Sequence, residues 1–129
     1  MKQTIVIVDD NDAIVDILKM CLANQGYGDV HGFCDPFEAL MFLKDHRVYL
    51  LVTDFKMPGM TGLELIDAAP KIPNIILTSC SFPEDRQLKR ECRKRGAIPM
   101  EKAALFKLLP SGLRQSADIP EEGNLSPAS

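Results

Sequence analysis

The sequence predicts an α/β protein with one doubly wound parallel sheet of five strands and five helices on its two faces. Short apolar, β-branched segments such as 4–8 and 48–53 alternate along the 129 residues with longer amphipathic segments. Apolar runs without polar alternation are typical of parallel strands that are covered on both faces. Because this alternation occurs five times, we expect right-handed crossovers within a single domain.

The first strand is expected at residues 4–8, and a helix from about residue 12 to 25 should follow it. Apolar residues recur there at helical spacing and would form one buried face: Ile14, Ile17, Leu18, Cys21 and Leu22. Gly26 would end this helix. A weak strand is predicted near 29–34.

A second helix is expected from the pair Asp35 and Pro36, an N-cap followed by proline in the first helical position, to about Asp45. The third strand is predicted at 48–53. A loop over 54–62 follows it, because Pro58, Gly59 and Gly62 interrupt regular structure.

The second half of the chain completes the alternation. A short helix over about 63–69 is ended by Pro70, and the fourth strand is predicted at 74–78. A fourth helix over about 84–95 should precede a poorly patterned fifth strand at 97–101. The last helix is expected to begin near Ala103 and to be interrupted at Pro110.

Composition places the chain among ordinary globular proteins, with 46% apolar and 26% charged residues. No segment has the roughly 20 apolar residues of a membrane span, and no signal peptide is recognisable, so we expect a cytoplasmic protein. The four cysteines lack metal-binding spacing, and we interpret them as small buried apolar residues: Cys21, Cys34, Cys80 and Cys92. His31 and His46 are isolated and are not expected to be ligands.

Charge is distributed unevenly. Residues 116–129 contain Asp118, Glu121 and Glu122 but no Lys or Arg, so this segment accounts for the whole net charge of −3. The remaining body is near neutral, which argues against direct nucleic-acid binding. We therefore expect one domain over 1–115, followed at 116–129 by a disordered tail or a truncated linker.

Three aspartates follow two of the predicted strands. Asp9 and Asp10 come after the first strand, and Asp54 comes after the third. Because the carboxyl ends of parallel strands meet at one edge of the sheet, these carboxylates should converge. Such a cluster repels itself unless a hard divalent cation neutralises it, so the pattern predicts a Mg²⁺ site.

Thr78 and Lys102 follow the fourth and fifth strands and would join the same edge. A carboxylate can attack a phosphoryl group, and Mg²⁺ and a lysine can neutralise the phosphoryl oxygens. No P-loop or GxGxxG sequence is present, so a nucleotide phosphate has no cradle. These residue types together indicate phosphoryl transfer to an aspartate.

With these residues the chain resembles the response-regulator receiver domains of bacterial two-component signalling. The resemblance covers about residues 3–115 and rests on four motifs: Val8-Asp9-Asp10, the stretch Val52-Thr53-Asp54-Phe55-Lys56-Met57-Pro58-Gly59-Met60-Thr61-Gly62, Leu77-Thr78-Ser79, and Lys102. It implies a flavodoxin-like, CheY-like receiver fold with strand order 2-1-3-4-5.

The resemblance also implies a role for each site residue. Asp54 would be the phosphoacceptor, and Mg²⁺ would be held by Asp9, Asp10, Asp54 and the backbone carbonyl of Lys56. Thr78 would bond a phosphoryl oxygen, and Lys102 would pair with the phosphoryl group. The donor would be a histidine kinase or a histidine phosphotransfer protein. Catalysis would be limited to the domain's own phosphorylation and dephosphorylation.

Simpler interpretations of these residues stay open. Asp9 and Asp10 could cap the first helix, and Asp54 could be a turn residue. Thr78 could be an ordinary strand residue, and Lys102 could be a solvated lysine.

The sequence departs from the family pattern around the fifth strand. The family usually has an aromatic residue three positions before the lysine, where this chain has Pro99, and a proline after the lysine, where it has Ala103. We therefore expect phosphorylation to be retained and the output to differ from the family norm. Lys56 and Cys80, two residues after Asp54 and Thr78, offer no group that orients water, which predicts slow self-dephosphorylation.

The predicted helix at 84–95 is strongly basic and offers only Leu88 and Cys92 to a core. It is either a docking face for an acidic output partner or a solvated helix face. The chain is expected to be a monomer or weak dimer, and no effector motif follows residue 115.

Two other functions are possible. One is a pseudo-receiver that works by docking without phosphorylation. The other is an aspartate-nucleophile phosphohydrolase, for which Asp10 and Asp12 would supply a weak D-x-D motif.

Overall fold

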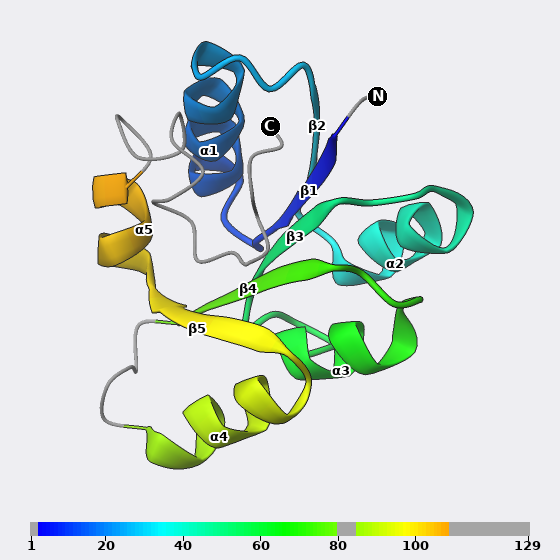
Figure 1. Cartoon of the computed structure of the whole chain (residues 1–129), viewed down its shortest axis with the longest axis vertical. Helices are drawn as coiled ribbons and strands as arrows, with labels where there is room; N and C mark the ends of the chain where they lie inside the picture. Colours follow the sequence, from blue (N-terminus) through cyan, green and yellow to red (C-terminus); the bar gives the residue numbers. More distant parts are fainter. Residues whose placement is uncertain (1–2, 80–84, 109–129) are drawn as a thin grey trace.

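The computed structural model describes residues 3–79 and 85–108. Five parallel strands form one sheet in the order β2-β1-β3-β4-β5, as Figure 1 shows. The strands are β1 (Thr4–Val8), β2 (Asp29–Phe33), β3 (Leu50–Asp54), β4 (Asn74–Ser79) and β5 (Ala97–Glu101). The helices are α1 (Asp12–Asn24), α2 (Pro36–Asp45), α3 (Gly62–Ala68), α4 (Arg86–Lys94) and α5 (Lys102–Leu108). The predicted fold class and strand order are confirmed.

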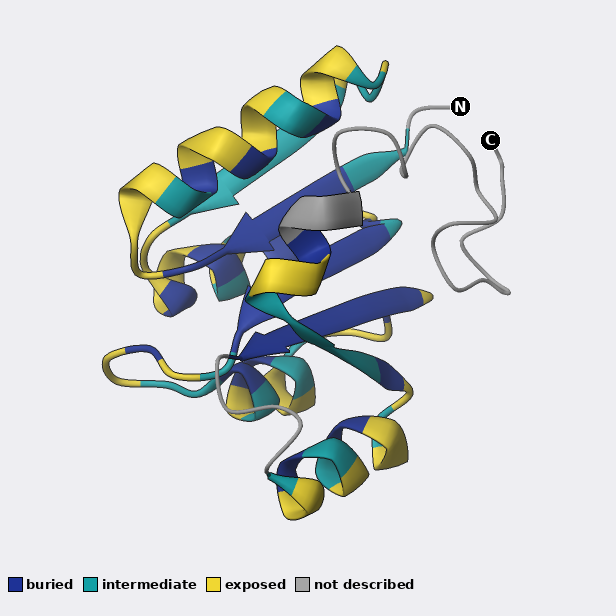
Figure 2. Ribbon diagram, turned by 90° about the vertical axis from the view of Figure 1, so that its left-hand side faces the viewer, coloured by how far each residue is buried: buried dark blue, intermediate teal, exposed yellow. Residues whose placement is uncertain are grey.

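The helices form two layers around the sheet (Figure 1). Helices α1 and α5 cover one face, where Leu18 and Leu105 pack with Ile7 of the central strand β1. Helices α2, α3 and α4 cover the other face, where Leu43 and Leu65 pack with the strands. The three central strands are therefore buried on both faces, as their colour in Figure 2 shows, which explains their uninterrupted apolar sequences.

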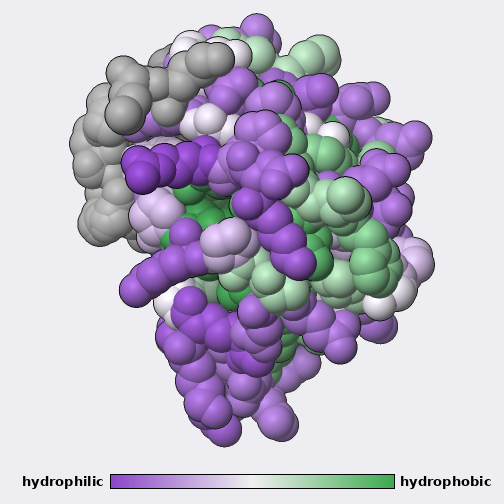
Figure 3. Space-filling view, turned by 90° about the vertical axis from the view of Figure 1, so that its right-hand side faces the viewer, coloured by the Kyte–Doolittle hydropathy of each residue, from purple (hydrophilic) through white to green (hydrophobic). Residues whose placement is uncertain are grey.

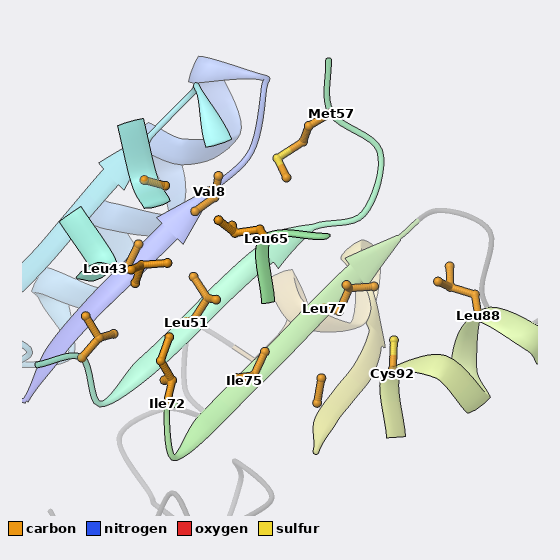
Figure 4. Close-up of a cluster of buried hydrophobic side chains, with 14 residues drawn as sticks. Val8, Leu43, Leu51, Met57, Leu65, Ile72, Ile75, Leu77, Leu88 and Cys92 are labelled. Carbon is orange, nitrogen blue, oxygen red and sulfur yellow. The ribbon is translucent and has the colours of Figure 1, made fainter. Parts of the chain in front are cut away.

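The larger of the two cores lies between β1, β3, β4 and the helices α2, α3 and α4 (Figure 4). Leu51 and Leu77 are completely buried at its centre. Helix α4 contributes only Leu88 and Cys92, and both are buried, as predicted from the sequence. Little apolar area therefore fixes α4 to the sheet.

Side chains cap four of the helices at their amino ends. Asn11 accepts hydrogen bonds from the N–H groups of Ala13 and Ile14, so it is the N-cap of α1, and Asp9 and Asp10 are not. Asp35 caps α2, as predicted, and Asp85 caps α4. Thr61 and Glu64 form a reciprocal capping box on α3, which binds two otherwise unpaired N–H groups at the end of the β3–α3 loop.

Two expectations about burial are wrong. Ile17 is 45% exposed, and Val15 is buried in its place, because the face of α1 that meets the sheet follows residues 15, 18 and 22. Cys34 is exposed rather than buried, because it lies between the edge strand β2 and helix α2. Cys92 is buried and Cys21 is half-buried.

Several expectations concern residues outside the described ranges. These are the burial of Cys80, the start of the fourth helix at residue 84, the interruption at Pro110, and the tail at 116–129. Among the helices of the described part, none is long and apolar enough to cross a membrane.

Candidate functional site

Asp9, Asp10 and Asp54 converge at the carboxyl edge of the sheet, the edge at which all five strands end. Asp9 follows the last residue of β1, and Asp54 ends the adjacent strand β3. One carboxylate oxygen from each lies within 4.8 Å of the other two. Asp9 and Asp54 are only 3% and 6% exposed, whereas Asp10 is open to solvent. The predicted cluster is therefore present, with one accessible and two buried carboxylates.

Backbone N–H groups orient the two buried carboxylates. The N–H of Asn11 donates to Oδ1 of Asp9 at 3.0 Å, and the N–H of Phe55 donates to Oδ1 of Asp54 at 2.9 Å. Each carboxylate thus has one oxygen held by the chain that follows its strand. The other oxygen of each, Oδ2, faces the same lysine.

That lysine is Lys102, the first residue of α5, which follows β5 directly. Its Nζ lies 3.0 Å from Oδ2 of Asp9 and 3.2 Å from Oδ2 of Asp54. Its side chain is 19% exposed. Lys102 is therefore not a solvated surface lysine.

Electrostatics couple these three side chains. Burial lowers the pKa of Lys102, but the contacts with Asp9 and Asp54 outweigh it, so that the pKa lies above its ordinary value. Burial, followed by the charge of Asp9, raises the pKa of Asp54, and Lys102 and the Phe55 N–H only partly offset this. The site therefore has more negative charge than its single ammonium neutralises, which favours a bound cation.

Thr78 lies beside Asp54 on the neighbouring strand. The two residues are partners in the β3–β4 ladder, and the N–H of Phe55 donates to the carbonyl oxygen of Thr78. The Thr78 hydroxyl donates to the carbonyl of Thr53 over 3.4 Å, a long and weak bond that a better acceptor could replace. On its other side Thr78 pairs with Met100 of β5.

The β3–α3 loop returns tightly onto Asp54. A Cβ atom on Gly62 would collide with the carbonyl oxygen of Asp54, and the N–H of Gly62 donates to the carbonyl of Phe55 at 2.8 Å. Gly59 has a φ of 84°, a conformation that favours glycine. Lys56 lies in this loop with its side chain exposed. The contact of Gly62 with Asp54 was not expected from the sequence, because a close approach between backbones has no local signature.

The arrangement suits a hard divalent cation. Its donors are carboxylate oxygens, which Mg²⁺ prefers, and they come from three side chains that already share a site. Asp12, the second aspartate of the D-x-D motif, is the exposed first residue of α1 and is not part of the group of three, so this site differs from the phosphohydrolase alternative.

Comparison with known proteins agrees with this geometry. Residues 5–100 match the response regulator receiver domain family. The chain is 37% identical over 86 residues to the transcriptional regulatory protein YvrH of Bacillus subtilis, which covers 64% of this chain and 36% of that protein. It is 32% identical over 91 residues to the response regulator GtcR of Aneurinibacillus migulanus, covering 68% and 37%. The chain thus spans about a third of the length of these curated relatives.

Solved structures show the same fold. The Vibrio cholerae chemotaxis protein CheY4 superposes with a TM-score of 0.73 at 26% identity, covering 84% of this chain and 97% of that one. A response regulator receiver protein from Pseudomonas putida superposes with a TM-score of 0.72 at 28% identity, covering 84% and 93%.

Proposed function

The chain belongs to the response regulator receiver domain family of two-component systems, and we propose that it accepts a phosphoryl group on Asp54. Receiver domains bind Mg²⁺ at an acidic pocket and are generally not enzymes. The observation that supports our proposal most directly is the convergence of Asp9, Asp10 and Asp54 with the ammonium of Lys102. A nucleophilic carboxylate, a cation site and a second positive charge are what phosphoryl transfer to an aspartate requires.

In the proposed reaction an oxygen of Asp54 attacks the phosphorus of a phosphohistidine. A new O–P bond forms while the P–N bond breaks, and the histidine nitrogen keeps the electron pair. The N–H of Phe55 fixes the orientation of the attacking carboxylate. Mg²⁺, held by Asp9, Asp10, Asp54 and the carbonyl of Lys56, would supply positive charge for the phosphoryl oxygens.

Lys102 and Thr78 would bind the transferred group. Lys102 would exchange its contact with Asp54 for a phosphoryl oxygen, and it remains in reach because Asp9 holds its Nζ at 3.0 Å. The Thr78 hydroxyl would leave its 3.4 Å bond to Thr53 for a phosphoryl oxygen. The Thr78 hydroxyl would thereby exchange a weak neutral hydrogen bond for a stronger charge-assisted one, and Lys102 would stay paired with an anionic oxygen.

Receiver domains interact with histidine kinases or phosphotransfer proteins, and we propose such a donor here. We propose that an acidic output partner docks on the basic helix α4, where Arg86, Arg90 and Arg93 are exposed. Arg95, just beyond α4, is not available for docking because its guanidinium binds Asp67 and Glu91. The docking face is therefore smaller than the sequence indicates.

A pseudo-receiver is the second candidate, and one observation favours it. Thr78 pairs with Met100 and is next to Pro99 in the ladder register, so no aromatic residue of β5 is its direct partner. A domain that docks without phosphorylation would not need an aromatic partner of Thr78 to transmit phosphorylation.

Intact mass measurement after incubation with Mg²⁺ and acetyl phosphate distinguishes the two. We expect the wild type to gain one phosphoryl group and Asp54→Asn to gain none. The matched control is Asp16→Asn, which removes an exposed aspartate of α1 and should be modified like wild type. A wild type that gains no phosphoryl group from acetyl phosphate or from phosphorylated histidine kinases would establish the pseudo-receiver instead.

The same experiment yields the lifetime of the phosphoryl group. After removal of the donor we expect slow loss of the added mass, because Lys56 offers no carboxylate or amide to orient water. Loss within seconds at neutral pH would contradict this expectation.

A further inference from the structure

A pocket of about 840 Å³ lies at the amino edge of the sheet, opposite the aspartate cluster. Its walls come from the start of β1 and from the α2–β3 and α3–β4 connections, which lie beside each other where the central strands begin. We call it the amino-edge pocket. The described residues that line it include Leu43, Lys44, Arg47, Val48, Lys71 and Ile72. None of them belongs to the candidate phosphorylation site.

The pocket has an apolar floor and a basic rim. Leu43, Val48 and Ile72 are buried, with 2%, 7% and 9% of their surface exposed. The side chains at the rim are exposed, and three are cationic: Lys44, Arg47 and Lys71. Figure 3 shows a recess of this kind, hydrophobic inside and bordered by hydrophilic side chains. Such a site fits an apolar group that carries negative charge next to it.

The rim cations lack a carboxylate partner among residues 3–79 and 85–108. Elsewhere in these ranges, Lys94, Arg95 and Lys102 do form ion pairs with carboxylates. Asp45 is the one acidic residue among the described residues of the lining. With His46 neutral, the three cations and Asp45 leave the pocket with a net charge of +2 (3 − 1).

We propose that the amino-edge pocket binds the acidic segment 118–122 of this same chain. The sequence of that segment is Asp-Ile-Pro-Glu-Glu, and no Lys or Arg occurs between residues 116 and 129. Its three carboxylates match the three rim cations, and Ile119 supplies an apolar side chain for the floor. Its composition thus complements the pocket in both charge and polarity.

The stretch between the end of α5 and residue 118 is long enough for the acidic segment to reach the amino-edge pocket. Helix α5 starts at the carboxyl edge with Lys102, and Leu105 lies in the same core cluster as Ile76 in the middle of β4 and Leu50 at the start of β3. The helix therefore runs toward the amino edge. A strand of five residues is about 17 Å long, whereas the ten residues 109–118 can span about 33–36 Å when extended.

Tethering also lowers the affinity that the contact needs. A segment joined by a short connection has an effective concentration on the order of millimolar at its site. An interaction with a millimolar dissociation constant would therefore occupy the pocket about half of the time. Ion pairs at an exposed rim are of this weak kind, and they are screened by salt.

Amide NMR spectra of the full chain test the proposal. The variant combines Asp118→Asn, Glu121→Gln and Glu122→Gln, which keeps the shape of the segment and removes its charge. We expect the amide signals of 43–49 and 71–72 to shift relative to wild type, while those of Asp9 and Asp54 stay in place. The shifts should shrink toward zero at high salt. The control, Asp16→Asn with Glu38→Gln, removes exposed carboxylates elsewhere and should leave the pocket signals unchanged.

A second experiment reverses the charges of the pocket and then those of the segment. Lys44→Glu with Lys71→Glu should release the wild-type segment, and adding Glu121→Lys with Glu122→Lys should restore the pocket shifts. Identical pocket signals in wild type and in the uncharged variant would overturn the proposal. In that case a synthetic peptide of residues 116–124, and an unrelated acidic peptide, would show whether the pocket takes an external acidic partner.

Discussion

The ammonium of Lys102 lies 3.2 Å from Oδ2 of Asp54, and the same Nζ lies 3.0 Å from Asp9. One cation therefore serves two buried carboxylates that come from different strands. This sharing ties the start of α5 to the ends of β1 and β3, and it makes the stability of the fold depend on the charge within the site.

We expect Lys102→Met to destabilise the protein by about 2–3 kcal/mol in the absence of Mg²⁺. Removing one partner of a fully buried ion pair costs about 3–5 kcal/mol, and this lysine is partly exposed. Excess Mg²⁺ should reduce the loss, because the ion supplies the missing positive charge. Urea unfolding with and without Mg²⁺ measures both effects.

Lys56→Met is the control for this prediction. It removes an exposed lysine of the neighbouring loop and leaves the backbone carbonyl in place, so its stability should stay within about 0.5 kcal/mol of wild type. A destabilisation of Lys102→Met that Mg²⁺ does not change would contradict a cation site between these carboxylates.

The sheet and the aspartate cluster could be predicted because their signals are local. Uninterrupted apolar runs identify β1, β3 and β4, and the aspartates follow two of those runs directly. Parallel strands then bring the residues together whatever the details of the packing. Lys102 was placed at the same edge because it follows the fifth strand, but that strand is poorly patterned. Its pairing with the phosphoryl group was expected only from the resemblance to a family.

Other features depend on contacts between distant segments. The exposure of Ile17 follows from the exact rotation of α1 over the sheet, and that rotation is set by Val15, Leu18 and Leu22. Arg95 was expected to be part of a basic surface, but it binds Asp67, 28 residues away. No periodic pattern in the sequence predicts an ion pair between residues so far apart in the chain.

Gly62→Ala should destabilise the protein by more than about 2 kcal/mol and slow phosphorylation. The added Cβ would collide with the carbonyl oxygen of Asp54 and would approach Leu77, which is completely buried. Displacing that carbonyl also moves the phosphoacceptor. Thermal unfolding and the rate of mass gain with acetyl phosphate measure the two consequences.

Gly28→Ala provides a matched comparison, because a Cβ at that position meets nothing within 4 Å. Its stability should equal or slightly exceed that of wild type, since alanine restricts the unfolded chain more than glycine does. Equal stabilities for the two alanine variants would show that the close approach of Gly62 to Asp54 does not contribute to the stability of the fold.

The pair formed by Arg95 and Asp67 connects α3 to the end of α4. The guanidinium donates from Nε and Nη2 to the two carboxylate oxygens of Asp67 at 2.7 and 3.0 Å. Because Asp67 is largely exposed, we expect Asp67→Asn to cost only about 0.5 kcal/mol. A double-mutant cycle with Arg95→Met should give a coupling energy of the same size.

This contribution should depend on pH in a defined direction. The hydrogen bonds from Arg95 lower the pKa of Asp67 below its ordinary value. The stabilisation is therefore complete above about pH 4, the ordinary aspartate value, and is lost as the pH falls through the lowered pKa of the folded state. The stability difference between wild type and Asp67→Asn should vanish there, and a difference that persists at lower pH would contradict the assignment.

Phosphorylation should change the α4–β5 region less than in receivers with an aromatic residue on β5. Thr78 pairs with Met100, whose unbranched side chain adapts to a moving neighbour without a ring flip. Amide spectra of residues 85–105 with Mg²⁺ and beryllofluoride, a phosphoryl mimic, should therefore show small shifts. Large shifts across α4 would show that the switch is coupled by another route.

The thiol of Cys34 should report Mg²⁺ binding at the aspartate cluster. The thiol is exposed, but its partial desolvation is the largest cause that raises its pKa, and the charges of four acidic residues raise it further: Asp12, Asp16, Asp9 and Asp10. Mg²⁺ bound by Asp9 and Asp10 would cancel part of this negative potential and lower the pKa of Cys34. Because only the thiolate reacts, alkylation by iodoacetamide near pH 8 should accelerate about twofold when excess Mg²⁺ is added.

Peptide-resolved mass spectrometry separates the reaction at Cys34 from that at the other cysteines. Cys21, on α1, is half-buried, and its alkylation rate gives an internal standard that excludes a general effect of salt. Asp10→Asn should abolish the response of Cys34 by removing the accessible carboxylate of the cluster while leaving the two buried ones. An equal rate at Cys34 with and without Mg²⁺ in wild type would place the ion outside this cluster, since a divalent charge bound there must change the potential at the thiol.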